Sequence, residues 1–172
     1  MRKRQPNSRM CFICGLQNPI GLKMALYNDL DLRQVVSTVT IPDHFQGYPG
    51  VVHGGIVATL LDEVASRAVL IDGRDEDLMV TVKIEVKYRQ PTPTQTPLTV
   101  IGRLLQPGRT RARAQGEIRL PDGAVTAEAE LLLARPPADF RERWVAELPF
   151  WKVYADEADA IDVGQVAGTM RP

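Results

Sequence analysis

Several features are scarce in this chain of 172 residues, and each scarcity excludes a class of protein. Two cysteines are too few for a disulfide framework. Lysine plus arginine number 21, as do aspartate plus glutamate, so the basic surplus of nucleic-acid or anionic-membrane binders is missing. No apolar run reaches the roughly 18 residues that span a bilayer, and the basic start leads into no apolar segment of a secretory signal. We therefore expect a cytoplasmic protein that binds neither nucleic acid nor membranes.

The remaining composition is that of a globular domain. Hydrophobic residues make up 44% and charged residues 24%, which is enough apolar material for one core. We expect a basic, solvated N-terminal tail over residues 1–10, a compact domain over 11–135, and a C-terminal extension over 136–172 with an acidic tail. A proline pair marks the second boundary, because proline cannot donate to a strand ladder. The extension should hold a short helix over 138–147, and its aromatic residues should pack back on the domain or shape an acyl pocket: Trp144, Phe150, Trp151 and Tyr154.

Hydropathy patterns in the middle of the chain indicate strands around one helix. Alternation of period two and apolar, β-branched stretches predict strands over 33–41, 80–89, 98–105, 109–120 and 124–134. Helical spacing of apolar residues predicts a helix from Gly54 or Gly55 to about Ile71. A row of small residues permits close approach of that helix: Ala112, Ala114 and Gly116. These patterns predict an α+β fold, with the helix on one face of an antiparallel sheet.

The start of the predicted helix carries the most informative residues. The tripeptide His53-Gly54-Gly55 lies where a loop becomes a helix, and the first amides of a helix have no internal partner and face outward at the positive end of its dipole. A carbonyl oxygen that gains negative charge would be stabilised there. About two turns on, Asp62 lies on the border of the apolar arc among small residues, which leaves room for a substrate. Its neighbour Glu63 is expected on the surface, in an i,i+4 pair with Arg67.

These residues resemble the hotdog-fold acyl-CoA thioesterases of the HGG type, including the phenylacetate-pathway thioesterases. The resemblance extends over residues 11–134. It rests on the HGG tripeptide with an aspartate nine residues after the histidine, the strand end Tyr88-Arg-Gln-Pro91, and the opening Cys11-Phe-Ile-Cys14-Gly15 with Asn18-Pro19 and Gly21-Leu22 after it. It implies a long helix wrapped by an antiparallel sheet. It also implies that two chains pair edge to edge, with active sites at the interface of a homodimer or of a homotetramer built as a dimer of dimers.

The resemblance implies a role for each site residue. The amide of Gly54 or Gly55 would polarise the thioester carbonyl, and Asp62 would act as general base on water or as nucleophile. His53 would orient the loop or contact the substrate. A hydroxyl from the partner chain would hold the water, and Thr81 occupies the matching place. This chemistry needs no metal and no cofactor, because coenzyme A enters only as part of the substrate.

Further residues are candidates for contact with the substrate. Some relatives carry an asparagine where this chain has Gly47, and Gln46 is the candidate to replace it. Arg89, Arg109 and Arg111 are candidates to hold the phosphates of coenzyme A, against the alternative of a solvated polar face.

The two cysteines form a CxxCG sequence, Cys11 to Gly15. A zinc site would need two further ligands, and the only histidines are His44 and His53. A redox pair would lack its usual βαβ surroundings. We therefore expect both cysteines to be structural, either buried or typical of the family.

The sequence as a whole predicts an enzyme that hydrolyses acyl-CoA thioesters to a free acid and coenzyme A, with the acyl group left open. A non-catalytic acyl-CoA-binding module on the same fold is the main alternative, and a hydratase of that fold is a third. At 1.5 Å per residue, Asp62 lies about 10–12 Å along the helix from Gly54, too far to meet that amide directly. The site should therefore combine Asp62 of one chain with the glycine amides of another.

Overall fold

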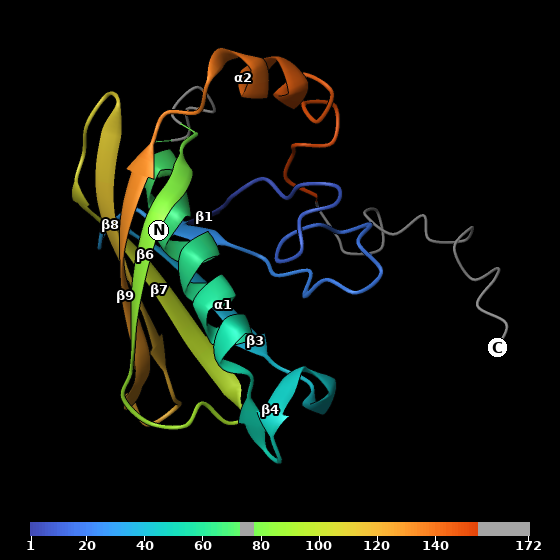
Figure 1. Ribbon diagram of the computed structural model, residues 1–172, viewed down its shortest axis with the longest axis vertical. Coiled ribbons are helices and arrows are strands. Elements are labelled where there is room, and N and C mark those ends of the chain that lie inside the picture. The colour runs from blue at the N-terminus through green and yellow to red at the C-terminus, as the bar shows by residue number, and fades with distance from the viewer. Residues whose placement is uncertain (73–77, 155–172) are drawn as a thin grey trace, which may run out of the picture.

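A computed structural model describes residues 1–72 and 78–154 of the chain. In these ranges one long helix, α1 (Gly54–Ser66), lies across one face of a seven-stranded antiparallel sheet (Figure 1). The sheet order is β1-β2-β3-β7-β8-β9-β6. The strands are β1 (Arg2–Arg4), β2 (Tyr27–Asp29), β3 (Gln34–Thr40), β6 (Val80–Tyr88), β7 (Pro97–Gln106), β8 (Arg111–Arg119) and β9 (Val125–Ala134). The predicted α+β architecture is confirmed. Neither helix in the described part of the chain has the length and hydropathy of a membrane span.

Small residues in the sheet let α1 pack directly against the strand backbones. The helix buries Val57, Leu60, Leu61, Val64 and Ala65. Beneath it lies the predicted small row of β8, Ala112, Ala114 and Gly116, which is buried. The closest approach is at Gly102 of β7, where a Cβ would lie 2.1 Å from the carbonyl oxygen of Val64. A side chain at this position would force helix and sheet apart.

The helix ends one turn earlier than predicted. It was expected to continue to Ile71, but α1 ends at Ser66 and the chain continues as the tighter 3-10 turn η2 (Arg67–Leu70). The Ser66 hydroxyl donates a hydrogen bond of 3.0 Å to the carbonyl oxygen of Glu63. Such local bonds from serine compete with the helical ladder. Ala68 and Leu70 remain buried in η2, so the apolar face continues although the helix type changes.

A bulge interrupts the strict alternation predicted for β6. Thr81 pairs with Leu133 of β9, whereas Lys83 pairs with the adjacent Leu132, so Val82 is an extra residue in the ladder. A bulge reverses the inward and outward faces on either side of it. Val82, expected to be inward, is 56% exposed. Thr81, expected on the outer polar face, instead faces α1.

Residues 1–10 are part of the domain, and the prediction of a solvated tail over 1–10 is wrong. β1 pairs with β2, and Gln5 and Asn7 are buried. The Asn7 side-chain amide donates to the carbonyl oxygens of Cys14 at 2.8 Å and Met24 at 3.0 Å. The Gln5 amide donates to the carbonyl oxygen of Arg67 at 3.2 Å. These amides satisfy buried backbone carbonyls, a task that hydropathy cannot reveal.

The C-terminal extension packs back on the domain, as predicted. The short helix α2 (Ala138–Trp144) leads to Trp151, which is only 8% exposed and lies edge-on to the Trp144 ring at a centroid distance of 5.1 Å. The Arg67 guanidinium lies 4.4 Å from the centre of the Trp151 ring. The backbone carbonyl of Lys152 accepts the Asn7 N–H at 3.0 Å, so this extension also covers the N-terminal segment. Beyond residue 154, the expected acidic tail lies outside the described residues.

Candidate active site

A small two-stranded ribbon holds the chain just before α1. It consists of β4 (Gln46–Tyr48) and β5 (Val51–Val52), and it follows the 3-10 turn η1 (Asp43–Phe45). Gly50 closes its turn with a φ of +74°, a conformation that favours glycine. The Gln46 side-chain oxygen accepts the Gly50 N–H at 3.1 Å. This contact gives Gln46, a predicted substrate-binding residue, a role in shaping the turn.

Gly47, the other predicted position in this ribbon, packs against His53. A Cβ on Gly47 would lie 3.2 Å from the His53 Cα and 3.3 Å from its Cδ2. A larger residue would push against the histidine that precedes α1. Gly47 therefore acts here through the placement of His53.

His53 caps the helix with its side chain. Its Nδ1 accepts the N–H of Gly55 at 3.0 Å, so the imidazole takes the place that serine or aspartate often fills at a helix start. This bond occupies the Gly55 amide, so the amides of the two glycines are not equally available to a ligand. Gly54 is the first helical residue, and its N–H has no intrahelical partner. In residues 1–72 and 78–154 no acceptor is found for it, so Gly54 offers the available amide at the positive end of the helix dipole.

Tyr88, at the end of β6, anchors the same helix start. Its hydroxyl donates a hydrogen bond of 2.8 Å to the Gly54 carbonyl oxygen, while its side chain stays 55% exposed. The sequence showed Tyr88 only as the last residue of a strand and as part of the motif at the strand end. Its contact with the helix depends on the pairing of β6 beside α1, which no local pattern encodes.

A groove of about 590 Å³ opens beside the Gly54 amide. The ribbon, the helix start and the segment after β6 form its walls, and its lining includes His53, Gly54, Tyr88 and Arg89. Asp62 is not part of this lining. One chain therefore presents the amide in a groove without the carboxylate.

Asp62 lies farther along α1, half-buried, beside the bulge of β6. The Thr81 hydroxyl donates a hydrogen bond of 2.7 Å to its Oδ1. Burial raises the pKa of Asp62 above its ordinary value, the Thr81 hydrogen bond works against that rise, and the negative charge of Glu63 adds to it. Thr81 belongs to the same chain as Asp62, whereas the family resemblance suggested a hydroxyl from the partner. A carboxylate held in this way is suited to accept a proton from water.

Glu63 and Arg67 form the predicted pair at 2.9 Å, but the prediction that Glu63 lies on the surface is wrong. Their side chains are 18% and 6% exposed. The C-terminal extension, with Trp151 on the Arg67 guanidinium, covers this turn of the helix. A helical wheel cannot show that a distant segment will cover its polar side.

The structure separates the candidate arginines. Arg89 lines the groove and forms an ion pair with Glu128. Arg109 lines a different cavity, of about 540 Å³, at the other end of the sheet. Arg111 is opposite Ala134 in β9, whereas Tyr88 is opposite Ala127. Arg109 and Arg111 of one chain are therefore not brought to its own Gly54 groove.

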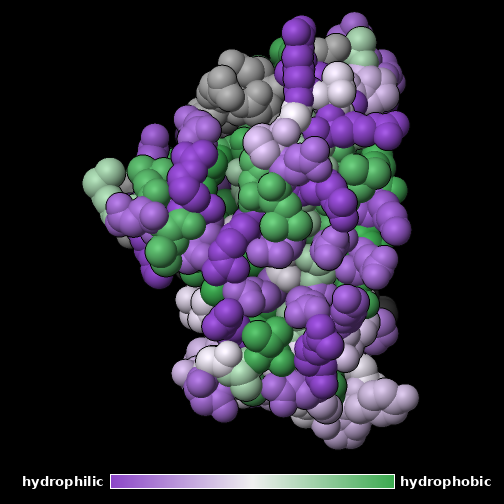
Figure 2. All heavy atoms as spheres, turned by 90° about the vertical axis from the view of Figure 1, so that its left-hand side faces the viewer, coloured by the Kyte–Doolittle hydropathy of each residue, from purple (hydrophilic) through white to green (hydrophobic). Residues whose placement is uncertain are grey.

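Arg111 also lies on the sheet face that points away from α1. Figure 2 shows this face as largely hydrophilic, with scattered hydrophobic groups. The exposed side of β8 carries Arg111, and Arg113 beside it pairs with Glu130 at 2.9 Å. Nearby, Arg103 pairs with Glu117 at 2.9 Å. The paired charges fit the alternative of a solvated polar face.

Comparisons with known proteins give consistent matches. Residues 49–127 match the family model described as the thioesterase superfamily. A solved structure of a thioesterase superfamily protein superposes with a TM-score of 0.67 at 33% identity, covering 73% of this chain and 60% of the other. A Streptococcus pneumoniae thioesterase protein solved with coenzyme A gives a TM-score of 0.55 at 25% identity, covering 60% of this chain and 78% of the other.

Among curated proteins, the acyl-coenzyme A thioesterase THEM4 of Rattus norvegicus is 25% identical over 103 residues. That match covers 60% of this chain and 43% of the rat protein, so the chain spans less than half the length of this relative.

Proposed function

Because residues 49–127 match the family model of the thioesterase superfamily and the chain has the hotdog fold of a solved superfamily protein, we propose that this protein hydrolyses acyl-CoA thioesters to a free acid and coenzyme A. One observation carries the proposal. The carboxylate of Asp62 is half-buried, burial raises its pKa, and the Thr81 hydroxyl holds it by a hydrogen bond. Asp62 lies on the same helix as Gly54, whose backbone amide is free to stabilise an oxyanion.

The proposed site is composite, formed by two chains. Gly54 and Asp62 lie about 12 Å apart along α1 at 1.5 Å per residue, and the groove at Gly54 lacks Asp62. β6 is the last strand of the sheet, so one of its sides has no neighbouring strand within the described residues. An exposed edge of this kind is a template for pairing with a second copy.

Antiparallel pairing of two β6 edges would complete the site. At one end of β6, Thr81 contacts Asp62, and at the other end Tyr88 contacts Gly54. A two-fold axis near the middle of β6 therefore places the Thr81 end of one strand beside the Tyr88 end of the other. The same axis would turn the Asp62 end of one α1 toward the Gly54 end of the other, since these ends follow Thr81 and Tyr88. Each carboxylate then faces the groove of the opposite subunit, and the dimer has two such sites.

The reaction follows from these two groups. The thioester carbonyl oxygen accepts a hydrogen bond from the Gly54 N–H, which stabilises the negative charge that develops on it. Asp62 takes a proton from water, and the water oxygen attacks the carbonyl carbon. The carbon–sulfur bond then breaks, its electron pair goes to sulfur, and the proton held by Asp62 moves to the departing thiolate. Direct attack by the Asp62 carboxylate is the alternative route, with an anhydride that water then opens. Neither route uses a metal or a cofactor.

The phosphates of coenzyme A need a cationic partner near the groove, and Arg89 is the proposed one. It lines the groove in which Gly54 lies, and its pairing with exposed Glu128 leaves it able to exchange partners. Arg109 lines a cavity at the Thr81 end, which the antiparallel pairing brings toward the groove of the partner subunit. The Arg111 side chain lies on the face of the sheet that is opposite to α1, and no role in phosphate binding is proposed for it.

Thiol release from a panel of acyl-CoA substrates, short, long and aryl, tests the proposal. The wild-type protein should release coenzyme A from at least one of them, and Asp62→Asn should lose that activity. Asp122→Asn is the matched control, because Asp122 lies in the exposed turn between β8 and β9 and an asparagine keeps the oxygen that accepts the Ala124 N–H. Calorimetric binding of acyl-CoA without thiol release from any substrate would favour the non-catalytic binding module.

A further inference from the structure

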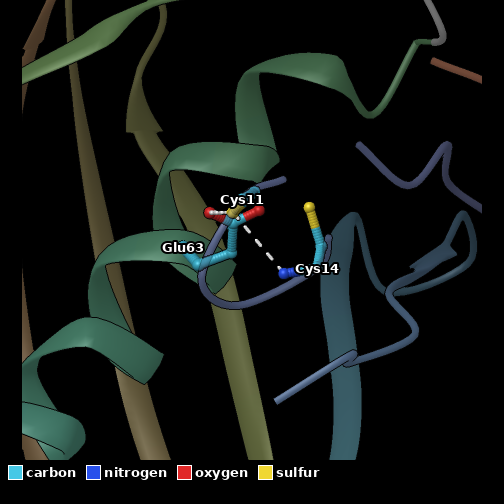
Figure 3. Close-up of side chains that lie close together, drawn as sticks. All are labelled: Cys11, Cys14 and Glu63. Atoms are coloured by element: carbon cyan, nitrogen blue, oxygen red, sulfur yellow. Dashed lines mark hydrogen bonds between the residues drawn. The ribbon is translucent and has the colours of Figure 1, made fainter. Parts of the chain in front are cut away.

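The two cysteines lie against α1 in a cluster that the proposed hydrolysis does not use. The sulfur atoms of Cys11 and Cys14 and a carboxylate oxygen of Glu63 all lie within 4.8 Å of one another (Figure 3). The Cys11 thiol approaches Glu63 Oε2 at 3.7 Å. Glu63, which the sequence pattern assigned to the surface, thus provides a third potential ligand beside the two cysteines.

The backbone around the cysteines is shaped to support a thiolate. The N–H groups of Ile13 and Cys14 point at the Cys11 sulfur, at 3.4 Å and 3.5 Å. The Gly15 N–H donates to the Cys11 carbonyl at 2.8 Å and closes the turn. A Cβ on Gly15 would lie 2.3 Å from that carbonyl oxygen, so this position requires glycine. Hydrogen bonds of this kind orient sulfur ligands and stabilise their charge around a metal ion.

The spacing of the donor atoms fits tetrahedral zinc. Zinc binds sulfur at about 2.3 Å and carboxylate oxygen at about 2.0–2.2 Å, which places a sulfur and an oxygen ligand about 3.5–3.7 Å apart at the tetrahedral angle. The distance between Cys11 Sγ and Glu63 Oε2, 3.7 Å, agrees with this value. The remaining separations, within 4.8 Å, need only small side-chain rotations to close on one ion.

The charges around the cluster balance when a divalent ion is present. Two thiolates and the Glu63 carboxylate supply three negative charges, and a divalent cation together with Arg67 supplies three positive ones. Arg67 donates to Glu63 Oε1 at 2.9 Å and to the Cys14 sulfur at 2.9 Å, so its positive charge is in direct contact with two of the three donors. A cavity of about 180 Å³ adjoins both sulfurs and Glu63 and has room for a water molecule.

We propose that Cys11, Cys14 and Glu63 bind one zinc ion, with a water from this cavity as the fourth ligand. The ion joins the N-terminal turn to the helix that carries Asp62. The donors come from two segments far apart in sequence, so the ion cross-links them. Zinc binding releases the protons of the cysteine thiols.

Metal analysis of the purified full-length protein tests the site. Elemental analysis should find one zinc ion per chain, and after chelation one equivalent of Co²⁺ should give thiolate-to-cobalt charge-transfer absorption in the near ultraviolet. Cys11→Ser and Cys14→Ser should each abolish that absorption, and Glu63→Gln should weaken metal affinity at least about tenfold. His44→Ala and Glu85→Gln, remote and exposed, are the controls and should leave binding unchanged.

A measurement on the unmodified protein covers the case in which a variant fails to fold. Zinc should protect both thiols of the chelated wild-type protein from alkylation, as followed by mass spectrometry. Absence of metal uptake by the reduced protein, or a cysteine variant that keeps its metal, would overturn the proposal. So would recovery of the pair as a disulfide under reducing conditions. None of these measurements uses an acyl-CoA substrate, so their failure is distinguishable from failure of the proposed hydrolysis.

Discussion

Replacement of Asp62 by asparagine removes one ionisable oxygen and leaves the shape of the side chain unchanged. The new amide keeps an oxygen that accepts the Thr81 hydroxyl, so the local packing at the bulge should survive. The Gly54 amide is untouched, and oxyanion stabilisation therefore remains. What is lost is proton removal from water, a contribution of about 10²–10⁴ in rate. We expect kcat/KM to fall by at least about 10², which corresponds to about 2.7 kcal/mol of transition-state stabilisation.

The same substitution should not destabilise the fold, and this expectation separates a catalytic role from a structural one. Burial raises the pKa of Asp62, so the folded state resists its ionisation. The ionised carboxylate therefore lowers stability progressively as pH rises from the ordinary aspartate pKa through the raised one. A neutral asparagine removes that cost, and at pH 7 the Tm should be equal to or higher than that of the wild type.

Thiol release measures the first effect, and thermal unfolding across pH measures the second. Near wild-type turnover on the best substrate would refute the catalytic assignment of Asp62. A large drop in Tm together with lost activity would show instead that the carboxylate is needed for folding. The loss of activity would then not be evidence for a catalytic role of Asp62.

Four further outcomes are expected. Sedimentation at micromolar concentration should show a dimer or a larger assembly, and a clean monomer would exclude the shared site. A mixture of the Asp62→Asn and Gly54→Val proteins should regain up to about a quarter of wild-type activity. After subunit exchange half of the dimers are mixed, and one of the two sites in each mixed dimer is intact. No recovery despite subunit exchange would contradict a composite site. Thr81→Val should move the acid limb of the kcat/KM profile to higher pH, because the hydrogen bond that lowers the pKa of Asp62 is lost, whereas Thr38→Val on the exposed side of β3 should not. Gly102→Ala should lower stability by about 1–3 kcal/mol through overpacking against Val64, as measured by denaturant unfolding, and an unchanged midpoint would mean that the helix yields easily.

The fold was predictable because its main elements obey simple periods. β8 alternates exposed arginines with buried small residues, and α1 has one apolar arc. In each element the hydropathy pattern therefore predicts which face is buried. Gln5 and Asn7 were missed for the opposite reason. Their side chains are polar and yet buried, and the carbonyls that they satisfy come from distant turns.

The candidate site was predictable in its residues and less so in its geometry. The HGG tripeptide and Asp62 identified the helix, but the choice between the two glycine amides needed the His53 cap. Thr81 was placed by resemblance, and only the bulge at Val82 explains how it turns toward Asp62. The sequence period would have put that hydroxyl on the outer face of the sheet.

The two ends of the described chain meet, and this has a consequence for synthesis on the ribosome. The Arg4 side chain donates to the carbonyl oxygen of Tyr154 across 150 residues of sequence, and Arg67 has Pro6 on one side and Trp151 on the other. Contacts of such high sequence separation form late. A nascent chain that has not yet exposed Trp151 can assemble its sheet and α1, but the helix end that carries Arg67 stays uncovered. The N-terminal segment thus makes all of its contacts only after nearly the last described residue has left the ribosome.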